Sequence, residues 1–213
     1  MPRSQGASAP VAADRRGANG ARAVAAERPI RADAARNRER LLTVAAAMFT
    51  QHGAEVPLED VARGAGVGIG TLYRHFPTRD ALVEAVYRHE VESLCTRADE
   101  LLEELPPDQA VAEWMQAFVQ HVKTKRGMLS ALKPLLASDS SLSALKGRAL
   151  ECASRLLAAG VAAGTIRDDI DGADLVRAVS GICMSTDQEG ARAAERLVRV
   201  IVDGLRTGST SPN

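Results

Sequence analysis

Residues 57–76 read PLEDVARGAGVGIGTLYRHF, and this stretch decides the fold. Its first half carries apolar residues at helical spacing, and its second half places Leu72 and Phe76 on one helix face. Glycines separate the two halves, and Gly66 can adopt the left-handed conformation that ends a helix. Two short helices joined by a tight turn are typical of a helix-turn-helix, whose second helix enters the major groove of DNA.

The second helix of the motif, residues 68–76, carries the groups that we expect to face DNA. With its apolar face turned inward, four polar side chains are left to face outward. They belong to Thr71, Tyr73, Arg74 and His75. Gly68 and Gly70 carry no side chain, so the backbone can come close to DNA. Arg79, just past the end of this helix, can meet a phosphate.

Three residues of this helix have two alternative roles. Ile69 lies at helical spacing from Leu72 and Phe76, so it belongs either at the DNA or in the small core. Tyr73 either contacts a phosphate or packs in the core, and contact is favoured because other residues already fill the inner face. His75 either contacts DNA or is an ordinary surface residue.

The rest of the chain is predicted to be all-α. A first helix begins at Arg31, where apolar residues start to recur at helical spacing, and Gly53 ends it. Thr78 can cap a helix that runs to about Glu104, where a pair of prolines breaks it. Further helices are expected near residues 108–124, 127–137, 141–163, 172–186 and 188–206. No segment alternates with period two for long enough to suggest a sheet.

These helices divide the chain into four parts. Residues 1–30 lack periodicity and are expected to be a flexible basic arm, with five Arg against two acidic residues. Residues 31–90 are expected to form a DNA-binding domain, 91–207 a helical ligand-binding and dimerisation domain, and 208–213 a flexible tail. Residues 1–80 carry 12 basic and 8 acidic side chains, so the zero net charge of the whole chain conceals a basic part suited to DNA.

The sequence offers no catalytic or metal-binding pattern. Four histidines lack the spacing of zinc ligands, and three widely spaced cysteines make neither a disulfide framework nor a zinc site. The acidic residues from Asp168 onward fail the test for a calcium loop, and a helix cap at Asp171 or Asp174 is favoured. Cys152 and Cys183 are expected to be buried thiols, with a redox sensor as the alternative. We expect no enzyme activity, cofactor, metal or membrane partner, and a cytoplasmic location.

The region from residue 37 to residue 91 resembles the DNA-binding region of TetR-family transcriptional regulators. The matching residues are Arg38…Leu41-Leu42…Ala45…Phe49…Gly53, then Val61-Ala62…Ala65-Gly66-Val67, then GTLYRHF at 70–76, then Arg79-Asp80-Ala81-Leu82. The resemblance implies a homodimeric repressor that binds double-stranded DNA. It would leave its operator when a small ligand enters the C-terminal domain. At the groove it places Ile69, Gly70, Thr71, Tyr73 and Arg74. At phosphates it places Tyr73, His75 and Arg79, and Arg38 and Gly68 complete the predicted DNA-binding set.

Two positions depart from the family pattern. Gly68 stands where the family has a Ser or Thr that opens the recognition helix, so that residue's cap and phosphate contact are not carried over. Pro57 and Leu58 stand where the family has a Thr at the start of the preceding helix, and the phosphate contact of that Thr is not carried over either.

Two further sites are expected in the C-terminal part. Residues 194–205 carry an apolar stripe that a monomer cannot easily cover, so the last two helices of two subunits should pack as a four-helix bundle. The predicted interface residues are Leu197, Val198, Ile201, Val202 and Leu205. A pocket for an unidentified, apolar effector is expected at Trp114, Met115, Phe118, His121, Met128 and Met184, although core packing is the better explanation for each one taken singly.

The mechanism expected from these parts is a shift of the helix that follows the motif. Ligand binding would move that helix and change the spacing of the two recognition helices on a palindromic operator. Two other functions stay open: a transcriptional activator of the same fold, and a helical small-molecule-binding protein without DNA function. Specific binding to DNA would exclude the second of these.

Overall fold

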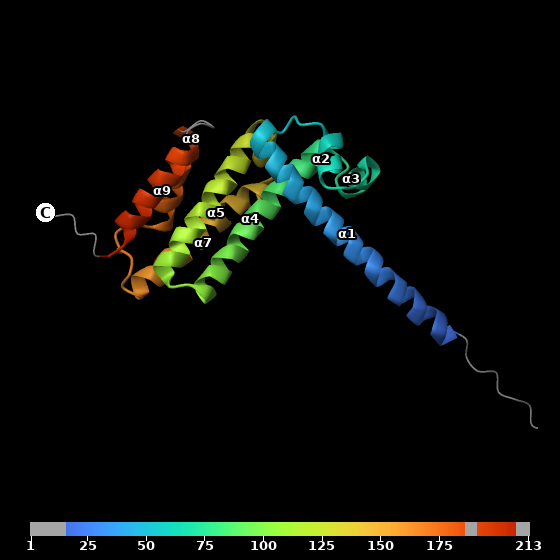
Figure 1. Ribbon diagram of the computed structural model, residues 1–213, viewed down its shortest axis with the longest axis horizontal. Helices are drawn as coiled ribbons and strands as arrows, with labels where there is room; N and C mark the ends of the chain where they lie inside the picture. Colours follow the sequence, from blue (N-terminus) through green and yellow to red (C-terminus); the bar gives the residue numbers. More distant parts are fainter. Residues whose placement is uncertain (1–15, 186–190, 208–213) are drawn as a thin grey trace, which may run out of the picture. The chain divides into compact units, whose positions relative to one another are not determined.

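The structure, a computed structural model, describes residues 16–185 and 191–207 (Figure 1). These residues form nine α-helices and no β-strand, so the predicted all-α class is confirmed. The helices are α1 (Arg16–His52), α2 (Leu58–Gly64), α3 (Ile69–His75), α4 (Arg79–Glu104), α5 (Pro107–Gly127), α6 (Leu129–Ser138), α7 (Ser140–Ala162), α8 (Gly172–Ser185) and α9 (Ala191–Leu205). Within the described ranges, no helix is long and apolar enough to cross a membrane. The chain divides into two compact units, residues 1–39 and 40–213.

The first unit is helical from Arg16 onward. Periodicity in the sequence predicted that this helix starts at Arg31, and that boundary is wrong. Alanine, the residue with the highest helix propensity, recurs between these two positions and sustains a helix without any amphipathic pattern. Residues 1–15 of the predicted arm and the predicted tail from residue 208 lie outside the described residues.

The turn between α2 and α3 follows from the glycine pattern. Gly66 has a φ of +67°, which only glycine adopts without strain. The Gly66 N–H donates to the carbonyl of Arg63, and the Val67 N–H donates to that of Ala62. These two bonds form a Schellman motif, which ends α2 by satisfying its last carbonyl groups.

The three helices around the motif start differently. Pro57 precedes α2 and Gly68 precedes α3, and neither provides a side-chain cap. For Gly68, the departure from the family pattern predicted this. Thr78 does cap α4, because its hydroxyl accepts a hydrogen bond from the Ala81 N–H at 3.0 Å. Only residues 76–78 separate α3 from α4.

Helices α4, α5 and α7 pack against one another at the centre of the second unit (Figure 1). Helix α8 packs on α5 and α7, and α9 packs on α5 and α8. The buried side chains form one continuous hydrophobic cluster, which includes Leu41 and Phe49 near the end of α1 and Leu72 of α3. The helix-turn-helix and the helical bundle therefore share a core.

The end of α5 lies close against the end of α1. A Cβ atom on Gly127 would lie 2.0 Å from the carbonyl oxygen of Phe49, so no side chain fits at this position. The hydroxyl oxygens of Thr50 and Thr124 lie 3.0 Å apart, within hydrogen-bond distance. Both α4 and α5 thus connect the bundle to the helices of the motif.

Asp171 and Asp174 cap the start of α8 reciprocally. The Asp174 N–H donates to the Asp171 carboxylate at 2.8 Å, and the Asp171 N–H donates to the Asp174 carboxylate at 3.5 Å. This capping box is the arrangement that the sequence favoured over a calcium loop. The part of the chain that the structure describes contains no cluster of acidic, His and Cys side chains able to hold a metal ion.

Candidate DNA interface and ligand pocket

Helix α3 turns an apolar face inward and a polar face outward. Leu72 and Phe76 are buried, whereas Arg74 is exposed and the Tyr73 side chain is 45% exposed. Residues of intermediate exposure flank this polar face. They are Ile69, Thr71 and His75.

The surroundings of Ile69 and Tyr73 bear on the two roles considered for each. Ile69 packs against the hydrophobic cluster and keeps part of its side chain at the surface. Tyr73 does not pack in the core, so its ring stays available to a partner. The His75 ring lies 6.1 Å from that of Phe76 between centroids, at the edge of the same surface.

Gly68 and Gly70 leave open space at the surface of α3. A Cβ atom on either residue would meet no atom of the described chain within 4 Å, and neither residue has a positive φ. Neither packing nor backbone conformation therefore requires glycine there. Inside a helix, as at Gly70, glycine costs about 1 kcal/mol relative to alanine. A close approach by another molecule to this backbone would account for both residues.

Arg79 stabilises the loop that precedes α2. Its Nη1 donates to the carbonyl oxygens of Ala54 and Val56, with a distance of 2.8 Å to the second. This guanidinium fixes the α1–α2 loop to the start of α4, a role that the predicted phosphate contact did not anticipate. Arg38 is exposed on α1.

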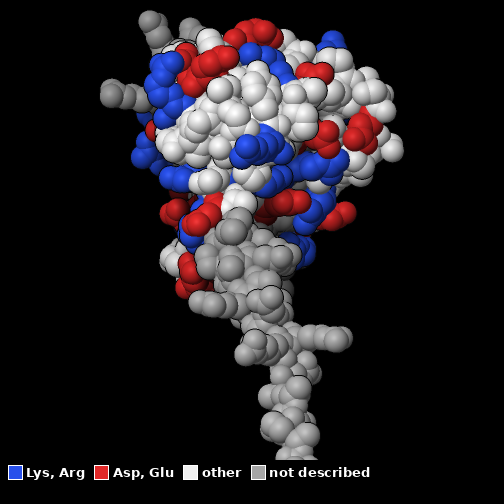
Figure 2. Space-filling model, turned by 90° about the vertical axis from the view of Figure 1, so that its right-hand side faces the viewer, with Lys and Arg blue, Asp and Glu red and all other residues white. Residues whose placement is uncertain are grey.

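Figure 2 shows the face of the molecule on which α2 and α3 lie. Lys and Arg side chains alternate there with Asp and Glu, around an area without charged residues. The Arg63 guanidinium pairs with the Asp60 carboxylate at 3.0 Å, which neutralises part of the positive charge. Arg74 forms no ion pair with the described part of the chain, so its charge is available to a phosphate or a base edge.

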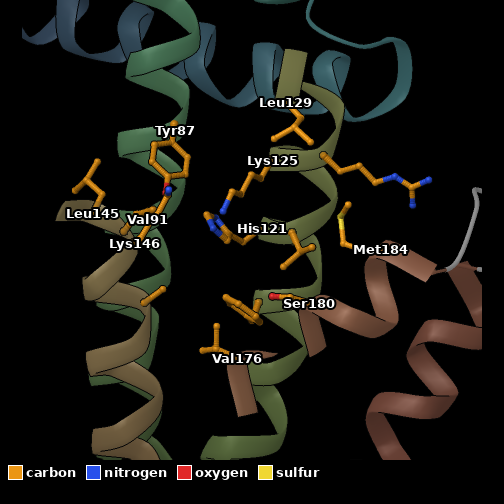
Figure 3. A pocket seen from close by; sticks show the side chains of 14 residues that line it. Tyr87, Val91, His121, Lys125, Leu129, Leu145, Lys146, Val176, Ser180 and Met184 are labelled. Atoms are coloured by element: carbon orange, nitrogen blue, oxygen red, sulfur yellow. The ribbon is translucent and has the colours of Figure 1, made fainter. Parts of the chain in front are cut away.

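A cavity of about 440 Å³ lies among α4, α5, α7 and α8 (Figure 3). Its volume falls within the range of roughly 300–1,000 Å³ that is usual for small-molecule sites. One part of its wall is apolar and includes Val91, Phe118, Val122, Leu145, Ala149 and Val176. The polar part consists of Tyr87, His121, Lys125, Arg126, Lys146 and Ser180.

Three of the six residues predicted for a ligand pocket line this cavity. They are Phe118, His121 and Met184. Trp114, Met115 and Met128 are fully buried in the core and do not form part of the wall. Trp114 stacks on Phe118 with 5.2 Å between ring centroids, and its indole N–H donates to the Leu94 carbonyl at 3.1 Å. Trp114 therefore supports the wall from behind.

Tyr87, Lys125 and Lys146 line the cavity although the sequence analysis did not include them. Tyr87 lies on α4 close to the motif, but it is buried and faces the cavity. The lysines were missed because lysine on an amphipathic helix ordinarily faces solvent. One signal was available for Lys125, which lies four residues after His121 and therefore on the same helix face.

His121 is a buried polar residue of the cavity wall. It is 6% exposed, and its Nδ1 has no hydrogen-bond partner among the residues described. Burial and then the charge of Lys125 lower its pKa to about 4, so the ring is neutral at pH 7. Its centroid lies 5.8 Å from that of Phe118 and 6.1 Å from that of Tyr87.

All three cysteines are buried, and two of them meet. Cys95 on α4 and Cys152 on α7 are distant in sequence, yet their sulfur atoms lie 2.8 Å apart. Burial and the neighbouring Cys152 raise the pKa of Cys95 to about 12, and burial raises the pKa of Cys183. Because the thiolate is the reactive form, the raised pKa of Cys183 argues against a redox sensor at that residue.

The apolar stripe of α9 that predicted a dimer is largely covered within the chain. Val198 is fully buried, and Val202 and Leu205 nearly so, because α9 packs on α5 and α8. For these three residues, the premise that a monomer cannot cover the stripe is wrong. A second row of apolar side chains on α9 remains exposed or partly exposed. It consists of Leu197, Val200 and Ile201.

Two family models match the chain. Residues 41–86 match a model described as bacterial regulatory proteins of the tetR family, and this range contains α2 and α3. Residues 106–207 match a model described as the C-terminal domain of SbtR-like transcriptional regulators, and this range contributes most of the cavity wall.

Two solved structures are similar over most of the chain. The TetR transcriptional regulator SCO0520 from Streptomyces coelicolor is 40% identical, with a TM-score of 0.74 over 81% of this chain and 99% of its own. A TetR transcription regulatory protein from Mycobacterium vanbaalenii is 38% identical, with a TM-score of 0.67 over 84% of this chain and 100% of its own.

A curated relative matches over a shorter range. The HTH-type transcriptional regulator SAB2452 of Staphylococcus aureus (strain bovine RF122 / ET3-1) is 30% identical over 83 residues, which are 38% of this chain and 45% of the relative. The chain thus spans less than half the length of the curated relatives that it matches.

Proposed function

The chain belongs to the TetR family of DNA-binding transcriptional regulators, and we propose that it acts as a homodimeric repressor that a small molecule releases from a palindromic operator. The observation that carries the proposal is the surface of α3. Its polar side chains face outward, and Gly68 and Gly70 leave a strip of bare backbone that no contact within the described residues explains.

The surface of α3 suits the major groove of DNA. The groove is about 12 Å wide and admits one helix, and bare backbone lets that helix sit deep in it. Arg74 is exposed and pairs with no carboxylate of the described residues, so its guanidinium can donate two hydrogen bonds to a guanine edge. The exposed Tyr73 hydroxyl can donate to a phosphate, which fixes the position of the helix without reading sequence.

The exposed row of apolar side chains on α9 is suited to contact with a second copy of the chain. Leu197 and Val200 present apolar side chains to solvent, and burial against another protein surface would stabilise them. Helices α8 and α9 of two subunits would form a four-helix bundle. A two-fold dimer presents two α3 helices, and it therefore requires an operator with two symmetric half-sites.

Release of the operator is proposed to start in the cavity among α4, α5, α7 and α8. Tyr87 in its wall lies eight residues after Arg79 on α4, which is about 12 Å at 1.5 Å per residue. On α5, the cavity residue Lys125 lies next to the contacts that Thr124 and Gly127 make with the end of α1. A ligand that fits only one arrangement of α4 and α5 would therefore favour the orientation of α3 that belongs to that arrangement.

Selection of bound duplexes from a random DNA pool tests this proposal with the full chain and no ligand. We expect enrichment of a two-fold symmetric sequence whose half-sites are about one helical turn, 10 base pairs, or a multiple apart. Enrichment of a single unsymmetric half-site would reject the dimeric mode of binding. No enrichment over the starting pool would reject sequence-specific DNA binding itself.

A further inference from the structure

The cavity contains two lysines that lack acidic partners. Lys125 extends from α5 and Lys146 from α7, and Figure 3 shows both side chains directed into the space beside Tyr87. The wall contains no Asp or Glu, and no carboxylate of the described residues pairs with either lysine. Lys125 also lies with its Nζ 6.0 Å from the centroid of the Tyr87 ring.

The two lysines place like charges in one cavity. Burial and then the charge of Lys146 lower the pKa of Lys125, so the charged form of Lys125 is destabilised. Charged groups withdrawn from water are normally paired, because an unpaired one loses hydration without compensation. An anion beside the Nζ atom of the partly buried Lys125 would compensate this loss, and the exposed Lys146 lines the same space.

His121 adds an unsatisfied hydrogen-bonding atom to the same space. Its Nδ1 lacks a partner among the described residues, and the ring is almost wholly enclosed. Buried polar atoms are nearly always hydrogen-bonded, so an occupant with an oxygen atom near this nitrogen would satisfy it. The neutral ring contributes no charge, and the positive character of the site therefore comes from Lys125, Lys146 and Arg126.

The remaining wall suits a hydrocarbon. Val91, Val122 and Val176 lie on three different helices and surround the space, and Phe118 adds an aromatic face. Apolar surface removed from water stabilises a complex by about 25 cal/mol per Å². A small inorganic anion would leave this part of the wall unused, and an uncharged hydrocarbon would leave the lysines unpaired.

We propose that the cavity binds an organic carboxylate with an apolar body, whose carboxylate lies between Lys125 and Lys146. Its body lies against Phe118 and the valines, and His121 forms a hydrogen bond with an oxygen of the ligand. The apolar effector expected from the sequence is thereby replaced by an amphipathic anion. This inference rests on the proposed function, because it names the class of effector.

Matched pairs of probes test the inference on the full chain without DNA. Decanoate is compared with decanamide, and 2-naphthoate with 2-naphthamide, by calorimetric titration below any micelle-forming concentration. Each pair shares one apolar body and differs in charge. We expect the carboxylate of at least one pair to bind at least tenfold more tightly than its amide, and quenching or enhancement of Trp114 fluorescence to report binding beside Phe118.

Variants of the two lysines test whether the preference for the carboxylate depends on them. Lys125→Met and Lys146→Met keep an unbranched side chain without the charge, and each should reduce the carboxylate preference about tenfold. Lys133→Met, at an exposed position on α6 outside the cavity wall, is the control and should keep the wild-type preference. Circular dichroism of each variant establishes that it is folded.

Three results would overturn the inference. The first is that the amides bind as tightly as their carboxylates. The second is that the wild-type protein binds none of the four probes. The third is that both Lys125→Met and Lys146→Met keep the preference for the carboxylate. None of these results bears on DNA binding, which the selection from a random pool measures in the absence of ligand. Failure of the ligand class and failure of the regulator function are therefore distinguishable.

Discussion

Gly70 lies inside α3 in open space, so its replacement separates folding from DNA binding. Alanine restricts the unfolded chain and has the higher helix propensity, and Gly70→Ala is therefore expected to stabilise the fold by about 0.5–1 kcal/mol. The added methyl group stands on the surface that we assign to DNA, so operator affinity should fall about tenfold, or 1.4 kcal/mol. Denaturant unfolding and titration of a labelled operator measure the two effects.

Gly147 is the matched control, because it also lies within a helix and its Cβ position is open. Gly147→Ala on α7 should stabilise the fold by a similar amount and leave operator affinity unchanged. If Gly70→Ala stabilises the fold and binds the operator like wild type, then DNA does not approach α3 at this residue.

His121 makes the stability of the fold depend on pH. Its pKa is about 4 in the folded chain, against an ordinary value of 6.5, so the unfolded chain takes up the proton first as the pH falls. The free energy of unfolding should therefore decrease between pH 6.5 and pH 4, by up to about 3 kcal/mol from this residue, and this contribution is constant below pH 4. Urea unfolding across this pH range, for wild type and His121→Phe, measures it.

Comparison with the variant is needed because other groups titrate nearby. The titratable neighbours of His121 in the cavity wall are Tyr87 on α4, Lys125 on α5 and Lys146 on α7. Glu90 on α4 has a pKa raised by burial, so its contribution has the opposite sign and favours the fold as the pH falls. A difference between wild type and His121→Phe that does not change with pH would contradict a buried, neutral His121.

Single residues were predicted from the sequence where their role depends on near neighbours. Leu72 and Tyr73 are adjacent on one short helix, and helical spacing assigned Leu72 to the core and favoured an outward position for Tyr73. Lys125 and Lys146 are 21 positions apart in the sequence and become neighbours only through the packing of α5 against α7. No local pattern contains that information, and His121 alone of the six polar residues in the wall was predicted.

Among the helices, α9 presents apolar side chains on two sides. One side is buried in the chain, while Leu197 is 45% and Val200 is 67% exposed. We expect Leu197→Glu and Val200→Glu to convert a dimer into monomers without loss of helical content, because the charge replaces only solvent-exposed surface. Light scattering or sedimentation at several protein concentrations measures the oligomeric state.

The controls for α9 distinguish an interface from the core. Ala137→Glu adds a charge at an exposed position on α6 and should leave the oligomeric state unchanged. Leu205→Glu places a charge in the core and should unfold the chain instead of dissociating it. A dimer that persists in both Leu197→Glu and Val200→Glu would contradict the role assigned to this helix.

The helices themselves were predicted with unequal success. The positions of α2 and α3 followed from Gly66 and from short-range apolar spacing, and both are local signals. The start of α1 was missed because alanine-rich helix has no amphipathic period. The inner side of α9 was mistaken for an interface, because periodicity identifies a face to be buried and does not say whether the same chain or another covers it.

At the scale of the whole molecule, α4 and α5 join the surface that we assign to DNA and the cavity that we assign to a ligand. Its 27 basic and 27 acidic side chains sum to zero, yet residues 1–80 hold an excess of basic groups. The rest of the chain has an excess of acidic groups, yet two lysines of that part, Lys125 and Lys146, line the cavity. Composition therefore describes neither surface, and the position of each charge in the fold decides which partner it suits.

Titration of the selected duplex, at one fixed salt concentration, decides whether α3 reads DNA. Wild type, Arg74→Ala and the control Arg148→Ala are each titrated against this duplex and against one with permuted half-sites. The account predicts that wild type and Arg148→Ala favour the selected duplex, and that Arg74→Ala loses about 1–3 kcal/mol of binding free energy on that duplex alone. Equal binding of both duplexes by wild type, or an Arg74→Ala variant that binds like wild type, would contradict it.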